Sequence, residues 1–215
     1  MARSKVRRGL ETSNIKVSRP NGQAEKLMKV AIELFSQRDF ASITIKDIAC
    51  AADVNSALIY YYFKSKEDLF REMIENAILQ ALENYGKLKA RHSDPVDMID
   101  DWFDNNVQMS ALIRQLVKIM IDYYHGSARI ASVDTLIRRF YKEETGIVAA
   151  GIRHGIAKGI FQHVDADRMA RFVSVHLDGI MVAAMIRPNF DIPSAIANLR
   201  QIFWHCLSKP TRRVA

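Results

Sequence analysis

Apolar residues recur along most of this chain at intervals of three and four positions, and this spacing limits the fold more than any other feature of the sequence. A period near 3.6 residues gathers such side chains on one face of a helix, whereas a half-buried strand needs strict alternation. Glycine and proline are sparse, with 9 and 5 among 215 residues, so little interrupts the pattern. We therefore predict an all-α protein with essentially no sheet.

Capping residues and helix breakers divide the chain into successive helical segments. The first predicted helix covers residues 23–37. Thr44, Asn55 and Ser65 can cap the next three, because their side-chain oxygens can accept a bond from an unpaired amide, and the last of these helices continues to about Ala90. Farther on, the spacing predicts five more helices at about 95–107, 110–125, 129–158, 166–187 and 194–208. At the end of the 129–158 helix and just beyond it, glycine recurs every four residues and predicts close helix packing: Gly151, Gly155 and Gly159.

Positive charge is concentrated at the start of the chain. Six basic residues and the single acid Glu11 precede Gly22, so this segment carries +5 of the formal net charge of +7. We predict a flexible basic arm over residues 1–21, which either contacts a DNA backbone or minor groove or remains solvated. The most apolar run, 179–186, is too short to cross a bilayer, so we expect a cytoplasmic protein with no membrane partner.

Residues 44–63 have the dimensions of a helix-turn-helix, with two short helices joined by a tight turn. Four apolar residues can form a core between them: Ile48, Ala49, Val54 and Ile59. Four residues of the second helix can then face outward: Ser56, Ala57, Tyr60 and Tyr61. In such a unit the second helix enters the major groove of DNA, phosphate contacts position it, and contacts to base edges give sequence preference.

At this point the chain resembles the TetR family of bacterial regulators. The resemblance spans about residues 24–70 and rests on the segments AIELF, SITIKDIA, YYYF and SKEDL, together with Phe40. It implies that these residues face a DNA operator: Thr44, Lys46, Asn55, Ser56, Ala57, Tyr60, Tyr61, Tyr62 and Lys66. The alternative for the tyrosines, Tyr60 above all, is that they pack the helix against its neighbour.

Two residues depart from the family pattern at the DNA-facing surface. Asp53 stands in the turn where the family usually has glycine, and aspartate tolerates the left-handed backbone conformation better than most residues. Ala57 stands where glycine is common, and its methyl group either limits the approach to a base pair or contacts a thymine methyl. The operator sequence therefore cannot be transferred from the family.

The resemblance also implies a division into a DNA-binding domain, 22–68, and a helical effector-binding and dimerisation domain, 69–215. The last two helices would form a four-helix bundle with a second copy of the chain, and the homodimer would bind a pseudo-palindromic operator. We expect its interface to contain Phe172, Val173, Ile180, Met181, Ile196, Leu199, Ile202 and Phe203. The alternative is that both helices simply belong to the core.

The family resemblance further implies a cavity for a small-molecule effector that releases the protein from DNA. Met, Tyr and Trp side chains suit a largely apolar pocket with a few hydrogen-bonding groups. The candidates, each of which could instead be core, are Trp102, Phe103, Met120, Tyr123, Tyr124 and Phe140. We expect repression, although the residues leave activation open.

Catalysis has little support in the sequence. Its six histidines lack metal-ligand spacing, and neither a phosphate-cradling glycine loop nor a nucleophile elbow is present. We therefore expect no enzyme activity, no metal and no cofactor. A helical enzyme and an architectural DNA-binding protein without an effector remain the alternatives to a ligand-responsive regulator.

Overall fold

The computed structural model describes residues 22–125 and 129–209, with the backbone alone at 88–89. Within these ranges the chain is helical and contains no strand, as predicted. The N-terminal part comprises α1 (Gly22–Gln37), the short 3₁₀ helix η1 (Phe40–Ser42), α2 (Ile45–Ala51), α3 (Ser56–Tyr62) and α4 (Lys66–Arg91). The predicted basic arm, 1–21, lies outside the described residues.

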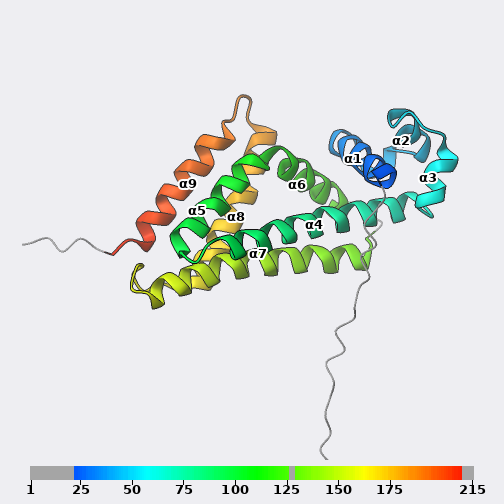
Figure 1. Cartoon of the computed structure of the whole chain (residues 1–215). Coiled ribbons are helices and arrows are strands. Elements are labelled where there is room, and N and C mark those ends of the chain that lie inside the picture. Colours follow the sequence, from blue (N-terminus) through cyan, green and yellow to red (C-terminus); the bar gives the residue numbers. More distant parts are fainter. Residues whose placement is uncertain (1–21, 126–128, 210–215) are drawn as a thin grey trace, which may run out of the picture.

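The C-terminal part comprises α5 (Pro95–Gln108), α6 (Ser110–His125), α7 (Ala131–Ala157), α8 (Ala166–Ile186) and α9 (Ile192–Leu207). Each of these five helices agrees with its predicted bounds to within two residues. The α1, α2 and α3 helices form one end of the molecule, α5, α8 and α9 lie toward the other, and the long helices α4 and α7 run side by side along its length (Figure 1).

The predicted caps explain where the N-terminal helices begin. The Thr44 hydroxyl accepts a hydrogen bond from the Asp47 amide, and the Asp47 carboxylate accepts one from the Thr44 amide, which completes a capping box. Asn55 caps α3 and Ser65 caps α4 through their side-chain oxygens. Three of the predicted helix starts are therefore confirmed at the level of the hydrogen bond.

Two hydrophobic clusters form the core. The first joins α1, α2 and α3 to the first half of α4, and it also includes Ile119 and Tyr123 of α6. The second is built mainly from α5, α7, α8 and α9. Because Leu69 and Phe70 pack in the first cluster while Tyr85 belongs to the second, α4 is shared between them. The division of the chain after residue 68 therefore stays a prediction.

Helix α7 packs closely against its neighbours at two glycines. A Cβ atom at Gly151 would collide with the Met98 side chain, and one at Gly155 would collide with the Phe161 ring. Gly159 follows the end of α7 with φ of +70°, a conformation that glycine adopts at little cost. The predicted close packing is therefore present at the first two glycines, while the third supports the turn toward α8.

Helix α8 is long and apolar enough to cross a membrane by length and composition alone, with a mean hydropathy of 1.5 over 18 residues. Only 28% of that window is buried within the folded chain. One face of α8 packs into the second cluster through Val173, Leu177 and Met181, which are buried. Its other face, with Phe172, Val175 and Ile186, is exposed.

Candidate functional site

The α2 and α3 helices form a compact helix-turn-helix. Ile48 and Ile59 are buried between the helices, and the Val54 amide donates to the Ala49 carbonyl across the turn at 3.0 Å. Asp53 occupies the turn with φ of +54°, in the left-handed region where the family pattern has glycine. This aspartate adopts the conformation expected from the sequence, and the turn closes without glycine.

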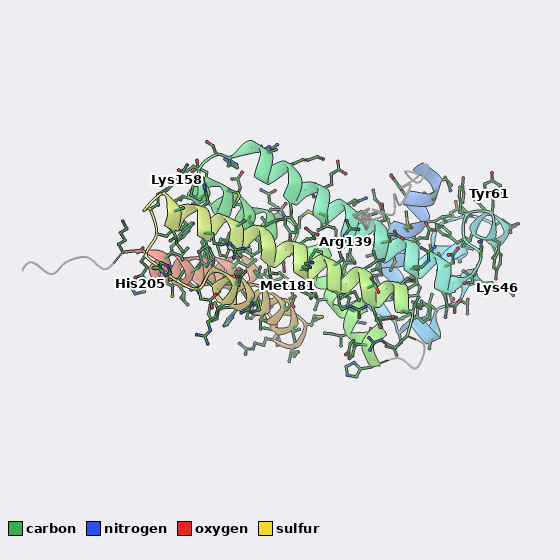
Figure 2. The ribbon with its side chains drawn as sticks, turned by 90° about the horizontal axis from the view of Figure 1, so that it is seen from below. Lys46, Tyr61, Arg139, Lys158, Met181 and His205 are labelled. Carbon is green, nitrogen blue, oxygen red and sulfur yellow. The ribbon has the colours of Figure 1, made fainter. Side chains whose placement is uncertain are left out.

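The second helix presents aromatic side chains to solvent. Tyr61 and Tyr60 have exposed fractions of 79% and 58%, and Ala57 beside them is exposed as well. The Tyr61 and Tyr62 rings meet edge to face with their centroids 5.0 Å apart. Lys46 of α2 is exposed at the same end of the molecule as Tyr61 (Figure 2). The predicted DNA-facing residues therefore include a basic and an aromatic side chain that are both exposed at one end of the molecule (Figure 2).

Two of the predicted residues have structural roles at this surface. The Thr44 hydroxyl donates to the Asp47 carboxylate at 2.7 Å, and this bond, with the Thr44 amide bond, lowers the pKa of Asp47. Asn55 Oδ1 accepts from the Ala57 amide at 2.9 Å. Both side chains thereby fix the starts of their helices. Ser56 begins α3 and is half-buried.

Lys66 is engaged inside the subunit. Its Nζ donates to the carbonyl oxygens of Phe40 and Ile43 at 2.8 and 2.9 Å, and it lies 4.3 Å from the centre of the Phe40 ring. These contacts join the first turn of α4 to the segment that leads into α2. Two of the three ammonium protons are therefore used to position the helix-turn-helix, and the predicted contact of Lys66 with DNA would have to use the third.

An internal cavity of about 110 Å³ lies between the central helices. Its walls come from α4, α5, α6, α7 and α8 and are mostly apolar. Of the six residues predicted to contact an effector, Met120 and Phe140 line this cavity. The other four do not line it. Trp102, Phe103 and Tyr123 are buried in the core, and Tyr124 is exposed on α6, where the Arg129 guanidinium lies 4.1 Å from its ring centre.

Sequence reasoning missed the acidic groups of the cavity. Glu144 of α7 accepts a hydrogen bond from the Ser174 hydroxyl at 2.7 Å, and Asp178 of α8 accepts one from the Tyr141 hydroxyl at 3.0 Å. Burial raises the pKa of Glu144 to about 7 and also raises that of Asp178. A signal was present, because Glu144 lies four residues after Phe140 and four before Val148, inside an apolar helix stripe.

The predicted dimer residues fall into two groups. Phe172 and Ile202 are exposed and Ile180 is half-buried, whereas five others are enclosed within the subunit: Val173, Met181, Ile196, Leu199 and Phe203. Those five are core residues of the subunit, so they cannot form an exposed contact surface. Two apolar residues of α8 outside the predicted set are also exposed, Val175 at 66% and Ile186 at 73%. Both helices thus have an inner apolar face and an outer one.

An exposed helix-turn-helix joined by one long helix to an internal cavity defines the class of DNA-binding transcriptional regulators. Residues 27–73 match the family model of the bacterial regulatory proteins of the tetR family. The chain is 23% identical over 159 residues to the transcriptional repressor KstR2 of Mycolicibacterium smegmatis, covering 73% of this chain and 76% of the relative. It is 26% identical over 164 residues to the repressor NicS of Pseudomonas putida, covering 70% and 71%.

Solved structures share the fold. A TetR transcription regulator from Haloarcula marismortui has a TM-score of 0.74 and 18% identity, and a transcriptional regulator from Saccharomonospora viridis in complex with choline has 0.76 and 20%. Each alignment covers 87% of this chain and 98% of the other. Residues 27–73 are thus similar to the DNA-binding segment of the TetR family of bacterial transcriptional regulators, and the relatives extend this similarity over about 70% of the chain. The proteins of this family and fold are DNA-binding regulators and not enzymes.

Proposed function

We propose that this chain is a ligand-responsive repressor that binds a pseudo-palindromic operator as a homodimer and leaves it when a small molecule binds. The observation that carries the proposal is the course of α4. Its first residue, Lys66, holds the segment before α2, and farther along Ile78 and Tyr85 line the internal cavity. One helix therefore contacts both the DNA-binding unit and the effector cavity.

DNA contact is assigned to the exposed surface of α2 and α3. Lys46 supplies a positive charge for a phosphate, and Tyr61 supplies a hydroxyl and a ring for the backbone or a base edge. Ala57 lies in the first turn of α3, where a helix inserted in the major groove contacts bases, so its methyl group would face a thymine methyl or a closely approached base pair. Lys66 and Thr44 act mainly by positioning.

The homodimer is assigned to the outer faces of α8 and α9. Phe172, Val175 and Ile186 follow one another at helical spacing along α8, and Ile202 is exposed on α9. A second copy of the chain is the occupant that suits this surface, because a two-fold bundle would cover both helices of both subunits at once. It would also explain why so little of the apolar window in α8 is buried within one subunit.

The effector is assigned to the cavity. Two helices could carry its effect, because α4 and α6 both line the cavity, and α6 also contacts α1 and η1. At the far end of α6 the Tyr123 ring stacks on Phe70 of α4, with centroids 5.5 Å apart. A ligand that favours another arrangement of these helices would change the separation of the two helix-turn-helix units in the dimer and weaken operator binding. The repressor would act in the cytoplasm.

Operator binding tests the DNA assignment. The full chain first selects duplexes from a random pool, and the selected duplex is then used in gel-shift titrations with single variants. We expect Tyr61→Ala and Lys46→Ala each to weaken binding at least about fivefold, since each removes a contact worth about 1 kcal/mol or more. Tyr124→Ala, which removes an exposed tyrosine outside α2 and α3, is the control. Unchanged affinity in both test variants would contradict the assignment.

A further inference from the structure

The effector cavity contains two acidic side chains and no matching positive charge. Glu144 and Asp178 enter its wall from different helices, α7 and α8, and Glu144 has an exposed fraction of only 6%. Among the described residues that line the cavity there is no lysine, arginine or histidine, and neither acid forms an ion pair with a described residue. The carboxyl pair is therefore uncompensated within the part of the chain that the structure describes.

Burying two neighbouring carboxyl groups carries a cost that the subunit only partly offsets. Each has one hydroxyl donor, from Ser174 for Glu144 and from Tyr141 for Asp178. A hydroxyl hydrogen bond stabilises a carboxylate, but it does not cancel the charge. Burial raises the pKa of both groups, and the charge of Asp178 raises that of Glu144 further. A cation placed between them would remove this penalty.

Aromatic rings line the same part of the cavity. Tyr141, which holds Asp178, lies beside Phe140 with the ring centroids 5.3 Å apart, and Tyr85 is a third aromatic residue in the lining. The negative face of an aromatic ring attracts a cation, most strongly for a charge that has left water. The remaining wall is largely aliphatic, with Ile74, Ile78, Ile113, Leu116 and Val117. It would cover an apolar body attached to the charge.

We propose that the cavity binds a cationic effector, a protonated amine or quaternary ammonium on an apolar body, whose charge lies between Glu144 and Asp178. This inference rests on the proposed function, in which the cavity is the effector site. An anionic ligand would meet two acids and no basic group among the described lining residues. A neutral apolar ligand would leave both carboxyl groups uncompensated. Only a cation on an apolar body would use the two acids, the aromatic rings and the aliphatic wall together.

Two probes of the same shape separate charge from apolar contact. Phenyltrimethylammonium and tert-butylbenzene differ in one central atom, nitrogen or carbon, and therefore in charge. Calorimetric titration of the full chain should show the cation binding at least about tenfold more tightly than its neutral counterpart. Glu144→Gln and Asp178→Asn should each reduce the affinity for the cation about tenfold and change that for tert-butylbenzene less than about twofold.

Glu143→Gln is the matched control, because it removes the same charge from an exposed neighbouring position on α7. Circular dichroism verifies the fold of each variant, and because the two test variants lie on separate helices, one that does not fold leaves the other to give the result. Equal affinity for the two probes, no binding of the cation, or cation binding that is unaffected by both variants would overturn the inference. Release of the selected operator by tert-butylbenzene would overturn it too, while leaving the proposed ligand-responsive repressor intact.

Discussion

The ammonium of Lys66 bonds to two carbonyl groups that lie 26 and 23 positions earlier in the chain. No local pattern predicts such a contact, because the motif places this lysine beside DNA and says nothing of the backbone before α2. The structure gives it a positioning role that a purely DNA-facing residue would not have. The positioning role of Lys66 can be measured on the free protein, without DNA.

Replacing Lys66 by methionine should destabilise the free protein. The substitution keeps much of the apolar stem but leaves the carbonyl groups of Phe40 and Ile43 without their donor, so the free energy of unfolding should fall by about 1–3 kcal/mol. Urea unfolding of the chain in the absence of DNA measures this. Lys64→Met, at an exposed position two residues earlier, should have little effect. A fully stable Lys66→Met variant that binds operator weakly would instead assign Lys66 to DNA.

Glu144 makes the stability of the ligand-free chain depend on pH. Its pKa is about 7 in the folded chain against an ordinary value of 4.5, so between these values the folded chain keeps a proton that the unfolded chain releases. The free energy of unfolding therefore falls as pH rises through this window and is lowest, as far as this group is concerned, above pH 7. The stability that protonated Glu144 contributes is fully present below pH 4.5.

The Glu144→Gln variant removes this titration. When the pH rises from about 5 to 7.5, the melting temperature of both chains should fall. The fall should be smaller for the variant than for the unaltered chain, and the difference between the two falls should be at least about 3 °C. Glu143→Gln, at the exposed position beside it, should follow the unaltered chain. Parallel melting curves for the Glu144→Gln variant and the unaltered chain across this range would show that the buried carboxyl group does not titrate as the structure indicates.

At the scale of whole elements, the helix boundaries follow from local chemistry. Thr44, Asn55 and Ser65 cap helices where the sequence places them, because a cap needs only a side-chain oxygen and the next few amides. The start of α9 differs from its prediction because Pro193 lies within the first turn, where its missing N–H costs nothing. The helix η1 was not predicted, since a single 3₁₀ turn has no apolar period.

Which face of a helix meets which neighbour could not be predicted from the sequence. Spacing identifies apolar stripes, but α8 carries two of them, so Val173 and Met181 were assigned to the dimer although they lie in the core. The cavity posed the same problem. Met120 and Phe140, which were predicted from residue type, line the cavity, whereas Glu144 and Asp178 line it only because α7 and α8 come together. Such sites depend on tertiary packing more than on local pattern.

The packing of α7 gives a prediction at this scale. Gly155→Ala would force a methyl group against the Phe161 ring, and the free energy of unfolding should fall by about 1–3 kcal/mol. Gly146→Ala lies on the same helix with nothing within 4 Å of the added carbon, so it should raise stability by about 0.5–1 kcal/mol through helix propensity. Thermal or urea unfolding of the two variants checks both signs. If both were stabilising, the close contact at Gly155 would be disproved.

The whole molecule places its proposed DNA surface and its proposed dimer surface far apart. Lys46 and Tyr61 lie at one end, whereas His205 of α9 lies at the other (Figure 2). In a dimer joined through α8 and α9, the two DNA-binding units would therefore be held apart by the bodies of the subunits. Their separation would depend on α4 and α6, which connect the cavity to the DNA-binding end. In the proposed repressor, effector response and dimerisation would thus be two parts of one mechanism.

Sedimentation velocity with the selected operator measures how many chains bind one duplex. We expect two chains on one palindromic duplex. Val175→Glu, which would bury a charge in the interface, should sediment as a monomer and lose at least about tenfold in operator affinity. Ile160→Glu, at an exposed apolar residue beyond the end of α7, should behave as the unaltered chain. A single chain per duplex at saturation, or a Val175→Glu variant that remains dimeric and binds normally, would contradict the account.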